Sequence, residues 1–271
     1  MHIKANAKIN PVLNIAGVLD NGYHRIDTLM QSVSLADDIY IEKIRKGIIV
    51  ECKNIASEKS ISFKAAELFF KEINKEPCVS IRIVHRIPFE AGLGGASANA
   101  AAVLNGLNEM YGYPIKRDRL IEISAGIGAD VPFCVVGGTA RCEGIGEKLT
   151  NFPFENKWNV VILKSANKPS TAAMYGALDK TEYSHPDTEN FCKAYLDGDF
   201  AAMKEFGGNS FSCLWNFEEI YDKFYSLGAD YCGLSGSGPC VFGIFKNKTG
   251  AENCAKNLTS RGEVFICETV N

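Results

Sequence analysis

The spacing of apolar residues changes along the chain from a two-residue period to a helical period. Residues 79–84 alternate apolar and polar side chains, as a strand does, until Ile87 and Pro88 break the pattern. A glycine-rich stretch follows. Apolar residues then recur at helical spacing, at Ala100, Val103, Leu104, Leu107 and Tyr111. The pattern therefore predicts a strand, a glycine loop and a helix in direct succession.

The rest of the first half alternates strands and helices in the same way. Residues 2–19 favour strands interrupted at Pro11, and residues 28–51 favour two more, around 37–38 and 46–47. Helices are expected at 59–74 and 117–127. A short helix opened by residues 128–132 should end at Gly137 and Gly138, with a strand or turn at 139–143.

The polar, proline-containing residues 151–156 indicate a domain boundary. We expect one domain at 1–154 and a second at 155–271. The second domain should contain strands at 158–163, 230–234, 240–245 and 263–269, and helices at 171–178, 188–196, 199–205, 216–227 and 249–259. Its closing strand-helix-strand-strand-helix-strand order is that of a split βαβ sandwich, so the predicted fold class is α+β.

Composition excludes several functional classes. The chain has 271 residues, 46% of them hydrophobic, and a formal net charge of −3, which argues against a nucleic-acid-coating role. No apolar run approaches a membrane span, and the start lacks the apolar core of a signal peptide. We therefore expect a cytoplasmic protein with no nucleic-acid or membrane partner. The ten scattered cysteines form no Cys-x-x-Cys pair, which favours reduced thiols and no metal site.

The glycine loop at residues 88–98 is the strongest candidate binding site. Gly92, Gly94 and Gly95 allow tight turns and close approach to a ligand, and the helix that follows presents N–H groups to an anion. Ser97 and Asn99 stand where they can cap that helix or contact a phosphate and its metal. The alternative is an ordinary strand-to-helix turn. The chain has no Gly-Lys dipeptide and no Gly-x-Gly-x-x-Gly, so neither common nucleotide motif applies.

Four other segments are weak pointers individually. The polar face of the first strand carries Lys8, and Asp130 precedes Val-Pro at the start of a short helix, where capping is the alternative role. Residues 233–239 form a Gly-Ser-rich turn between two strands. Residues 21–25 form an Asn-Gly turn that presents Tyr23 and His24 together.

The order of these segments resembles the GHMP kinases, named for galactokinase, homoserine kinase, mevalonate kinase and phosphomevalonate kinase. The likeness rests on the Lys-bearing first strand, the Pro-x-x-x-Gly-Leu-Gly-Gly-x-Ser loop and the C-terminal Gly-Ser-Gly turn. It implies a two-domain fold, with an N-terminal ATP-binding and catalytic domain (1–154) like the second domain of ribosomal protein S5 and a ferredoxin-like C-terminal substrate domain (155–271). It also implies ATP with Mg²⁺ as co-substrate. The chain departs from the family at Ala96, at Ser60 and across residues 165–171.

The likeness is strongest to members that phosphorylate the 2-hydroxyl of a cytidine diphosphate sugar alcohol in the non-mevalonate route to isoprenoid precursors. Carried over by resemblance, Asp130 is the candidate base, and Lys8 lowers the pKa of the hydroxyl or holds Asp130 ionised. The phosphates should contact Pro88, Phe89, Glu90, Ala91, Gly92, Leu93, Gly94, Gly95, Ala96, Ser97 and Ala98. Metal is expected near Ser97, with no metal site built from the protein alone.

A cytosine ring needs stacking and edge contacts, for which Tyr23 and Tyr175, then His24 and Asn10, are the candidates. Two alternatives stay open: a kinase for another small alcohol of the mevalonate or homoserine type, and a non-catalytic nucleotide-binding module. A monomer or weak homodimer is expected.

Overall fold

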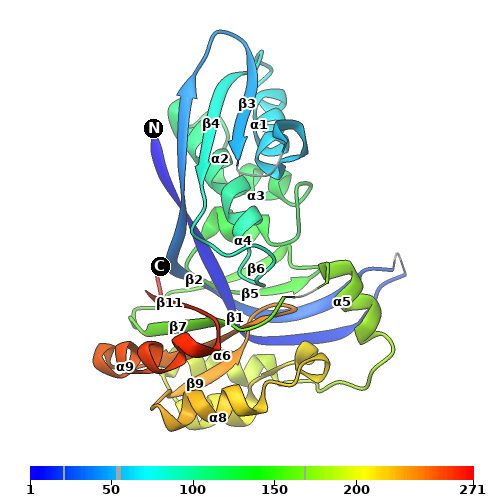
Figure 1. Ribbon diagram of the computed structural model, residues 1–271. Coiled ribbons are helices and arrows are strands. Elements are labelled where there is room, and N and C mark those ends of the chain that lie inside the picture. The colour runs from blue at the N-terminus through cyan, green and yellow to red at the C-terminus, as the bar shows by residue number, and fades with distance from the viewer. Residues whose placement is uncertain (21, 53–55, 168) are drawn as a thin grey trace. The chain divides into compact units, whose positions relative to one another are not determined.

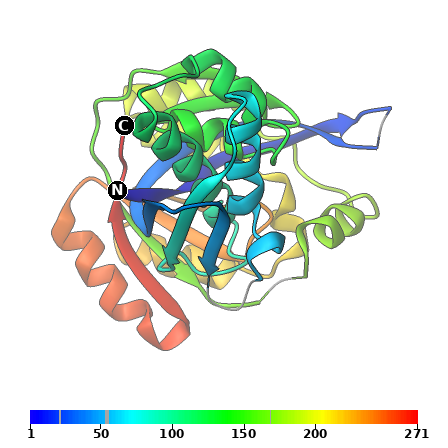
Figure 2. The same cartoon turned by 90° about the horizontal axis from the view of Figure 1, so that it is seen from above.

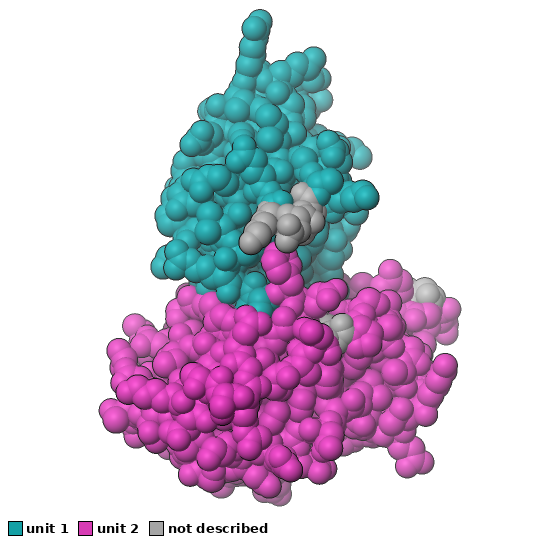
Figure 3. Space-filling model, viewed as in Figure 1, with its two compact units in different colours: residues 1–7, 36–88, 94–137 teal, residues 8–35, 89–93, 138–271 magenta. Residues whose placement is uncertain are grey.

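The computed structural model describes residues 1–20, 22–52, 56–167 and 169–271. Asn21 of the predicted turn and Lys168 of the 165–171 segment lie outside the described residues. The chain forms two compact units, coloured separately in Figure 3. Unit 1 comprises Met1–Ala7, Ala36–Pro88 and Gly94–Gly137, and unit 2 comprises Lys8–Leu35, Phe89–Leu93 and Gly138–Asn271. These units interleave along the sequence and do not divide at residue 154, so the expected domain boundary stays a prediction.

Unit 1 is a sheet covered by helices. Its strands are β3 (Gly47–Cys52), β4 (Cys78–Val84) and the end of β2 (His24–Lys43), with β4 parallel to β3 and antiparallel to β2. The start of β1 (His2–Val18) joins through Met1, which exchanges backbone hydrogen bonds with Ile41. The helices are α1 (Ile61–Glu72), α2 (Gly95–Met110), α3 (Arg117–Ser124) and α4 (Val131–Val136), with a 3-10 turn η1 at Ser57–Lys59. The core packs Ile39, Ile41 and Ile81 against Phe69 and Leu104, so alternate strand residues face the helices.

Strand β1 continues through Pro11, where the sequence predicted an interruption. Proline lacks an N–H, so a strand keeps it only where the ladder does not need that donor. The short strand β8 (Gly208–Asn209) pairs with Val12 and Leu13, beside the proline and not at it. The Pro11 carbonyl accepts a hydrogen bond from the Tyr231 hydroxyl at 2.8 Å.

Unit 2 contains two sheet regions (Figures 1 and 2). In one, β5 (Thr139–Gly144) pairs antiparallel with β2 and with β6 (Lys148–Phe152). The other is a four-stranded antiparallel sheet in the order β11-β7-β10-β9. Its strands are β7 (Asn159–Lys164), β9 (Tyr231–Leu234), β10 (Cys240–Phe245) and β11 (Glu263–Glu268). The helices are α5 (Thr171–Leu178), α6 (Thr188–Asp197), α7 (Phe200–Phe206), α8 (Glu218–Ser226) and α9 (Lys248–Leu258), with 3-10 turns η2 (Ser210–Leu214) and η3 (Thr259–Arg261).

The strand order of the four-stranded sheet confirms the split βαβ prediction. The two central strands, β7 and β10, are the first and third of the four in the chain, and helices α8 and α9 pack residues such as Phe224 and Leu258 against their apolar side chains. The predicted helices form at nearly the expected residues. Strands β6 and β8 were not predicted, because β6 is largely exposed and β8 is only two residues long.

Candidate active site

Three segments far apart in the sequence meet at the backbone carbonyl of Gly92 in unit 2. The Lys8 Nζ donates to that oxygen at 3.1 Å, and the Ser235 hydroxyl donates to it at 2.9 Å. The Lys8 backbone N–H also donates to the neighbouring Leu93 carbonyl at 3.0 Å. The Lys-bearing strand, the glycine loop and the Gly-Ser turn therefore form one hydrogen-bonded site.

Lys8 is a buried cation held by oxygen atoms. Its residue is only 4% exposed, and its Nζ donates to the Asn10 Oδ1 at 2.6 Å. The Asn10 Nδ2 donates in turn to the Thr28 hydroxyl, which donates to the Val12 carbonyl. A buried charge is costly unless it is hydrogen-bonded. The polar face of β1 is thus exposed at Lys4 but forms a buried network at Lys8 and Asn10.

Glycine is required where the loop meets the Gly-Ser turn. Gly92 has φ +77°, and a Cβ there would collide with the Ser235 carbonyl oxygen. Gly236 has φ +56°, and its Cβ would lie 3.0 Å from the Gly92 oxygen. The Asn209 amide holds the turn by donating to the Leu234 and Gly236 carbonyls, both at 2.8 Å. The close backbone approach explains why the motif residues are glycines.

The second part of the glycine loop leads into α2 in unit 1. Gly94, at φ 68°, is the N-cap, and among the described residues no side chain caps the helix. The first N–H groups of α2 therefore lie at the positive end of its dipole with no capping side chain, as at anion-binding helix starts. Ser97 is partly exposed on the first turn.

Asn99 does not cap α2, which was one of the roles considered for it from the sequence. It is 3% exposed, and its Nδ2 donates to the Asp37 carboxylate at 2.9 Å. Helical geometry turns residue 99 inward, toward the sheet, whereas Ser97 remains partly exposed.

Asp130 occupies the N-cap position of α4 in unit 1. Its backbone is helical, at φ −84° and ψ −10°, and within the described residues its side chain makes no capping hydrogen bond to α4. Pro132, in the first turn, fixes the helix start without needing a donor. The capping role considered from the sequence is therefore absent. Because Lys8 belongs to the other unit, joint action of the two residues stays a prediction.

His24 and Tyr175, predicted cytosine contacts, lie together in unit 2. Their ring centroids are 4.5 Å apart, and the His24 Nε2 lies 2.6 Å from the Asp179 Oδ1. Tyr175 also packs edge-on against Phe211. Tyr23 is 61% exposed, so it is not a core aromatic. Asp179 was missed from the sequence, because nothing in its position at the end of α5 marks it as a partner of a residue 155 positions away.

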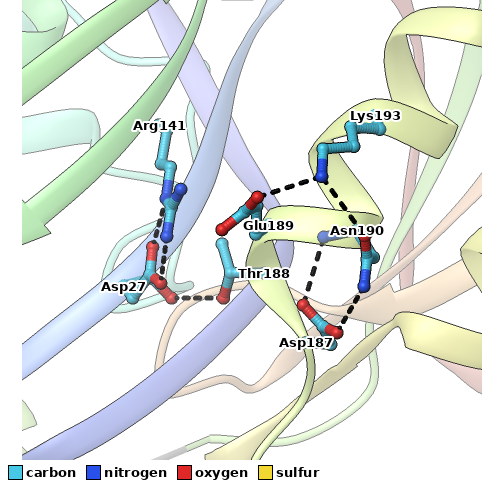
Figure 4. Close-up of polar contacts among 7 residues, drawn as sticks. All are labelled: Asp27, Arg141, Asp187, Thr188, Glu189, Asn190 and Lys193. Atoms are coloured by element: carbon cyan, nitrogen blue, oxygen red, sulfur yellow. Dashed lines mark hydrogen bonds and ion pairs between the residues drawn. The ribbon is translucent and has the colours of Figure 1, made fainter.

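A polar clamp holds β2, which begins with His24, to β5 and α6 (Figure 4). The Arg141 guanidinium binds both Asp27 carboxylate oxygens at 2.8 Å, and the Thr188 hydroxyl donates to the Asp27 carbonyl at 3.1 Å. At the N-cap of α6, hydrogen bonds from the Asn190 backbone and side chain lower the pKa of Asp187. These contacts fix the strand on which the candidate substrate residue stands.

The described residues contain no group of three or more His, Cys, Asp or Glu side chains placed to hold a metal ion. Within the same residues, none of the helices is both long and apolar enough to cross a membrane.

Comparison with known proteins identifies the family. The GHMP kinases N terminal domain matches residues 60–138, and the GHMP kinases C terminal domain matches residues 201–264. The chain is 40% identical over 278 residues to 4-diphosphocytidyl-2-C-methyl-D-erythritol kinase of Acetivibrio thermocellus, covering 99% of this chain and 98% of that one. It is 36% identical over 281 residues to the enzyme of the same name from Clostridium tetani, with both chains fully covered.

Solved structures agree with these matches. A crystal structure of 4-(cytidine 5'-diphospho)-2C-methyl-D-erythritol kinase superposes with a TM-score of 0.84 at 26% identity, over the whole of both chains. Methanococcus jannaschii mevalonate kinase shares the fold, with a TM-score of 0.73 at 15% identity over 100% of this chain and 98% of that one. The fold is therefore that of a GHMP kinase. Among these kinases, the chain belongs to the 4-diphosphocytidyl-2-C-methyl-D-erythritol kinase family, which confirms the resemblance and the α+β class inferred from the sequence.

Proposed function

We propose that this protein transfers the γ-phosphoryl group of ATP to the 2-hydroxyl of 4-(cytidine 5'-diphospho)-2-C-methyl-D-erythritol. The meeting of Lys8, the glycine loop and Ser235 at the Gly92 carbonyl carries the proposal, because it joins the three GHMP signature segments in one hydrogen-bonded site. The full-length relatives support the choice of acceptor. The protein would act on small molecules in the cytoplasm, as a monomer or weak homodimer.

Phosphoryl transfer asks the protein mainly to position groups and to offset charge. In this proposal the loop at 88–98 holds the ATP phosphates, with the uncapped start of α2 facing them. Mg²⁺ usually binds through substrate phosphates and one or two protein oxygens, which suits a site with the Ser97 hydroxyl and no dedicated cage among the described residues. The ion would neutralise charge on the transferring phosphate.

Asp130 would accept the proton of the acceptor hydroxyl, and Lys8 would supply positive charge. A carboxylate is a suitable general base for a hydroxyl when it lies within hydrogen-bond reach of the proton. Lys8 is preorganised, since the Asn10 and Gly92 oxygens hold its ammonium. A preorganised cation stabilises developing charge without reorganising during the reaction.

The cytidine end would be bound by aromatic rings and polar groups of unit 2. Tyr23 and Tyr175 would stack, and His24 would supply a polar contact to the base. Asn10, which is 1% exposed and bonded to Lys8 and Thr28, would instead hold the Lys8 ammonium. The hydrogen bond between Asp179 and the His24 Nε2 fixes the orientation of the imidazole, as a second group often does for a functional histidine. Recognition of the cytosine ring would therefore depend on Asp179 as well as on His24.

The test is an ADP-release assay that offers the cytidine compound, mevalonate and homoserine side by side at equal concentration. Turnover should be confined to the cytidine compound. Equal or faster turnover with mevalonate or homoserine would replace the acceptor and leave a GHMP kinase of another specificity. ATP binding without ADP release from any of the three would instead support the non-catalytic module. The Asp130→Asn variant serves as the control for contaminating kinase.

A further inference from the structure

Asp37 is a buried carboxylate with four hydrogen-bond donors around it in unit 1. It lies on β2, is 1% exposed, and accepts the backbone N–H groups of Arg86 at 2.7 Å and Ile87 at 2.8 Å on its Oδ1. Its Oδ2 accepts the Asn99 amide at 2.9 Å and lies 2.9 Å from the His85 Nδ1. Hydrogen bonds to a charged group are the strong ones, and a buried charge persists only when it has them.

The donors come from both sides of the glycine loop. Arg86 and Ile87 immediately precede the loop, and Asn99 stands in the helix that follows it. The loop backbone also lies close to its entry flank, since a Cβ added at Gly95 would lie 3.0 Å from the Ile87 Cγ2. Glycine-rich segments lose the most conformational freedom on ordering, so a loop of this kind depends on rigid ends. One carboxylate ties these ends together.

The next residue on the strand makes a different set of contacts. Asp38 is also buried, at 5% exposed, but within the described parts of the chain its partners are side chains: the Arg86 guanidinium at 2.6 Å and the His2 ring at 2.8 Å. Its hydrogen bond from His2 and the nearby Arg86 charge lower the pKa of its carboxyl group. Asp38 therefore serves as a control for Asp37. It is a buried carboxylate on the same strand, but the backbone N–H groups of Arg86 and Ile87 donate to Asp37 and not to Asp38.

We propose that Asp37 is a positioning residue of the glycine loop, which clamps the loop's entry and exit so that its N–H groups are preorganised for the nucleotide phosphates. The affinity for ATP then depends on a carboxylate that contacts no nucleotide. This proposal rests on the proposed function only in naming ATP as the ligand of the loop.

The test compares Asp37→Asn with Asp38→Asn. Asp37→Asn keeps the shape of the side chain but removes its negative charge and places an NH₂ group against the two donors at Oδ2, the Asn99 amide and the His85 ring. The Asn99 amide can turn over to present its Oδ1, which has no partner among the described residues, so the loss falls on the charge and on the contact with His85.

Asp37→Asn should raise the ATP dissociation constant, measured by calorimetry, and the ATP KM by about tenfold or more, because it breaks charge-assisted bonds at Oδ2. The KM for the acceptor should stay within about twofold of wild type, as should ATP binding by Asp38→Asn. Unchanged ATP affinity in folded Asp37→Asn, or an equal loss in Asp38→Asn, would overturn the proposal.

Hydrogen exchange of residues 88–96 without ligand separates this proposal from the proposed function. Exchange in the loop should be faster in Asp37→Asn than in Asp38→Asn, because the loop opens more often once the Asp37 hydrogen bonds to its flanks are weakened. If the wild-type protein bound no ATP, the kinase proposal would fail, but the exchange rates would still show whether Asp37 holds the glycine loop in place. Equal exchange in the two variants would refute it.

Discussion

At the scale of single residues, Gly92 is the site position that we expect to tolerate a side chain least. Gly92→Ala should lower the melting temperature and weaken ATP binding, because the new Cβ meets the Ser235 carbonyl and the backbone has φ +77°. Gly112→Ala separates the two causes. Gly112 has φ +78° but no heavy atom within 4 Å of an added Cβ, so this variant should lose only the backbone term of about 1–2 kcal/mol. Equal losses of stability and equal ATP affinity in the two variants would show that contact with Ser235 is unimportant.

Asp130 is expected to matter for turnover and not for stability. Asp130→Asn removes the base while keeping the shape, so kcat should collapse with little change in melting temperature. Asp199→Ala is the contrasting variant, because Asp199 does cap a helix by accepting the Ala201 and Ala202 N–H groups at 3.1 Å. That variant should lose about 0.5–2 kcal/mol of stability and keep its turnover. The reverse outcome for Asp130, a lower melting temperature with normal kcat, would make it a structural residue.

The double variant Lys8→Ala with Asp130→Asn tests joint action. It should lose little more activity than the worse single variant, as expected for groups that act as a unit. Independent, multiplying losses in steady-state kinetics would separate the two roles.

Tyr23 is exposed, so its removal should leave the fold intact. If it stacks on cytosine, Tyr23→Ala should raise the KM for the cytidine substrate by about ten- to hundredfold, because a stacked base contributes about 1–3 kcal/mol. ATP affinity should barely change. Tyr113→Ala is the control, since Tyr113 is 68% exposed and belongs to the other unit. A KM that rises equally in both variants, or in neither, would remove Tyr23 from the substrate site.

At the scale of elements, we expect the ion pair that joins β2 to β5, Arg141 with Asp27, to contribute more stability than the more exposed pair of Arg119 with Glu72. Both Arg141 with Asp27 and Arg119 with Glu72 use two hydrogen bonds. The Arg141 side chain is 23% exposed and the Arg119 side chain 47%. Arg141→Ala should cost about 1.5–3 kcal/mol of unfolding free energy, because it leaves Asp27 desolvated without its partner. Arg119→Ala should cost about 0–1 kcal/mol. Denaturant unfolding of both variants checks this, and equal costs would contradict the assignment.

At the scale of the whole molecule, the cysteines report on global unfolding. All ten are free thiols, of which six are buried and only Cys213 is exposed. Burial raises the pKa of Cys192, Cys232 and Cys267 to about 12, so these groups stay protonated near pH 8 and react poorly with disulfide reagents. Cys213 should react first in the native protein, and the buried thiols only as denaturant unfolds it. Rapid labelling of the buried thiols in native buffer would mean that unit 2 opens locally.

The sequence alone determined much of the element order and the chemical candidates. Apolar periods of two and 3.6 residues are local properties, so the glycine loop before α2 and the split βαβ order at the end of the chain were predictable from 88–111 and 158–269. The motifs also marked Lys8 and Asp130 as candidate catalytic residues, whose joint role remains a prediction.

Only the tertiary structure decided what those residues touch. The contacts at Gly92 join positions 8, 92 and 235, and Asp37 joins positions 86, 87 and 99, over sequence separations that no periodicity encodes. Pro11 inside β1 and Asp179 beside His24 were missed for the same reason. Whether a polar residue is solvated, buried in a network or available for chemistry depends on its neighbours in space, and long-range packing selects those neighbours.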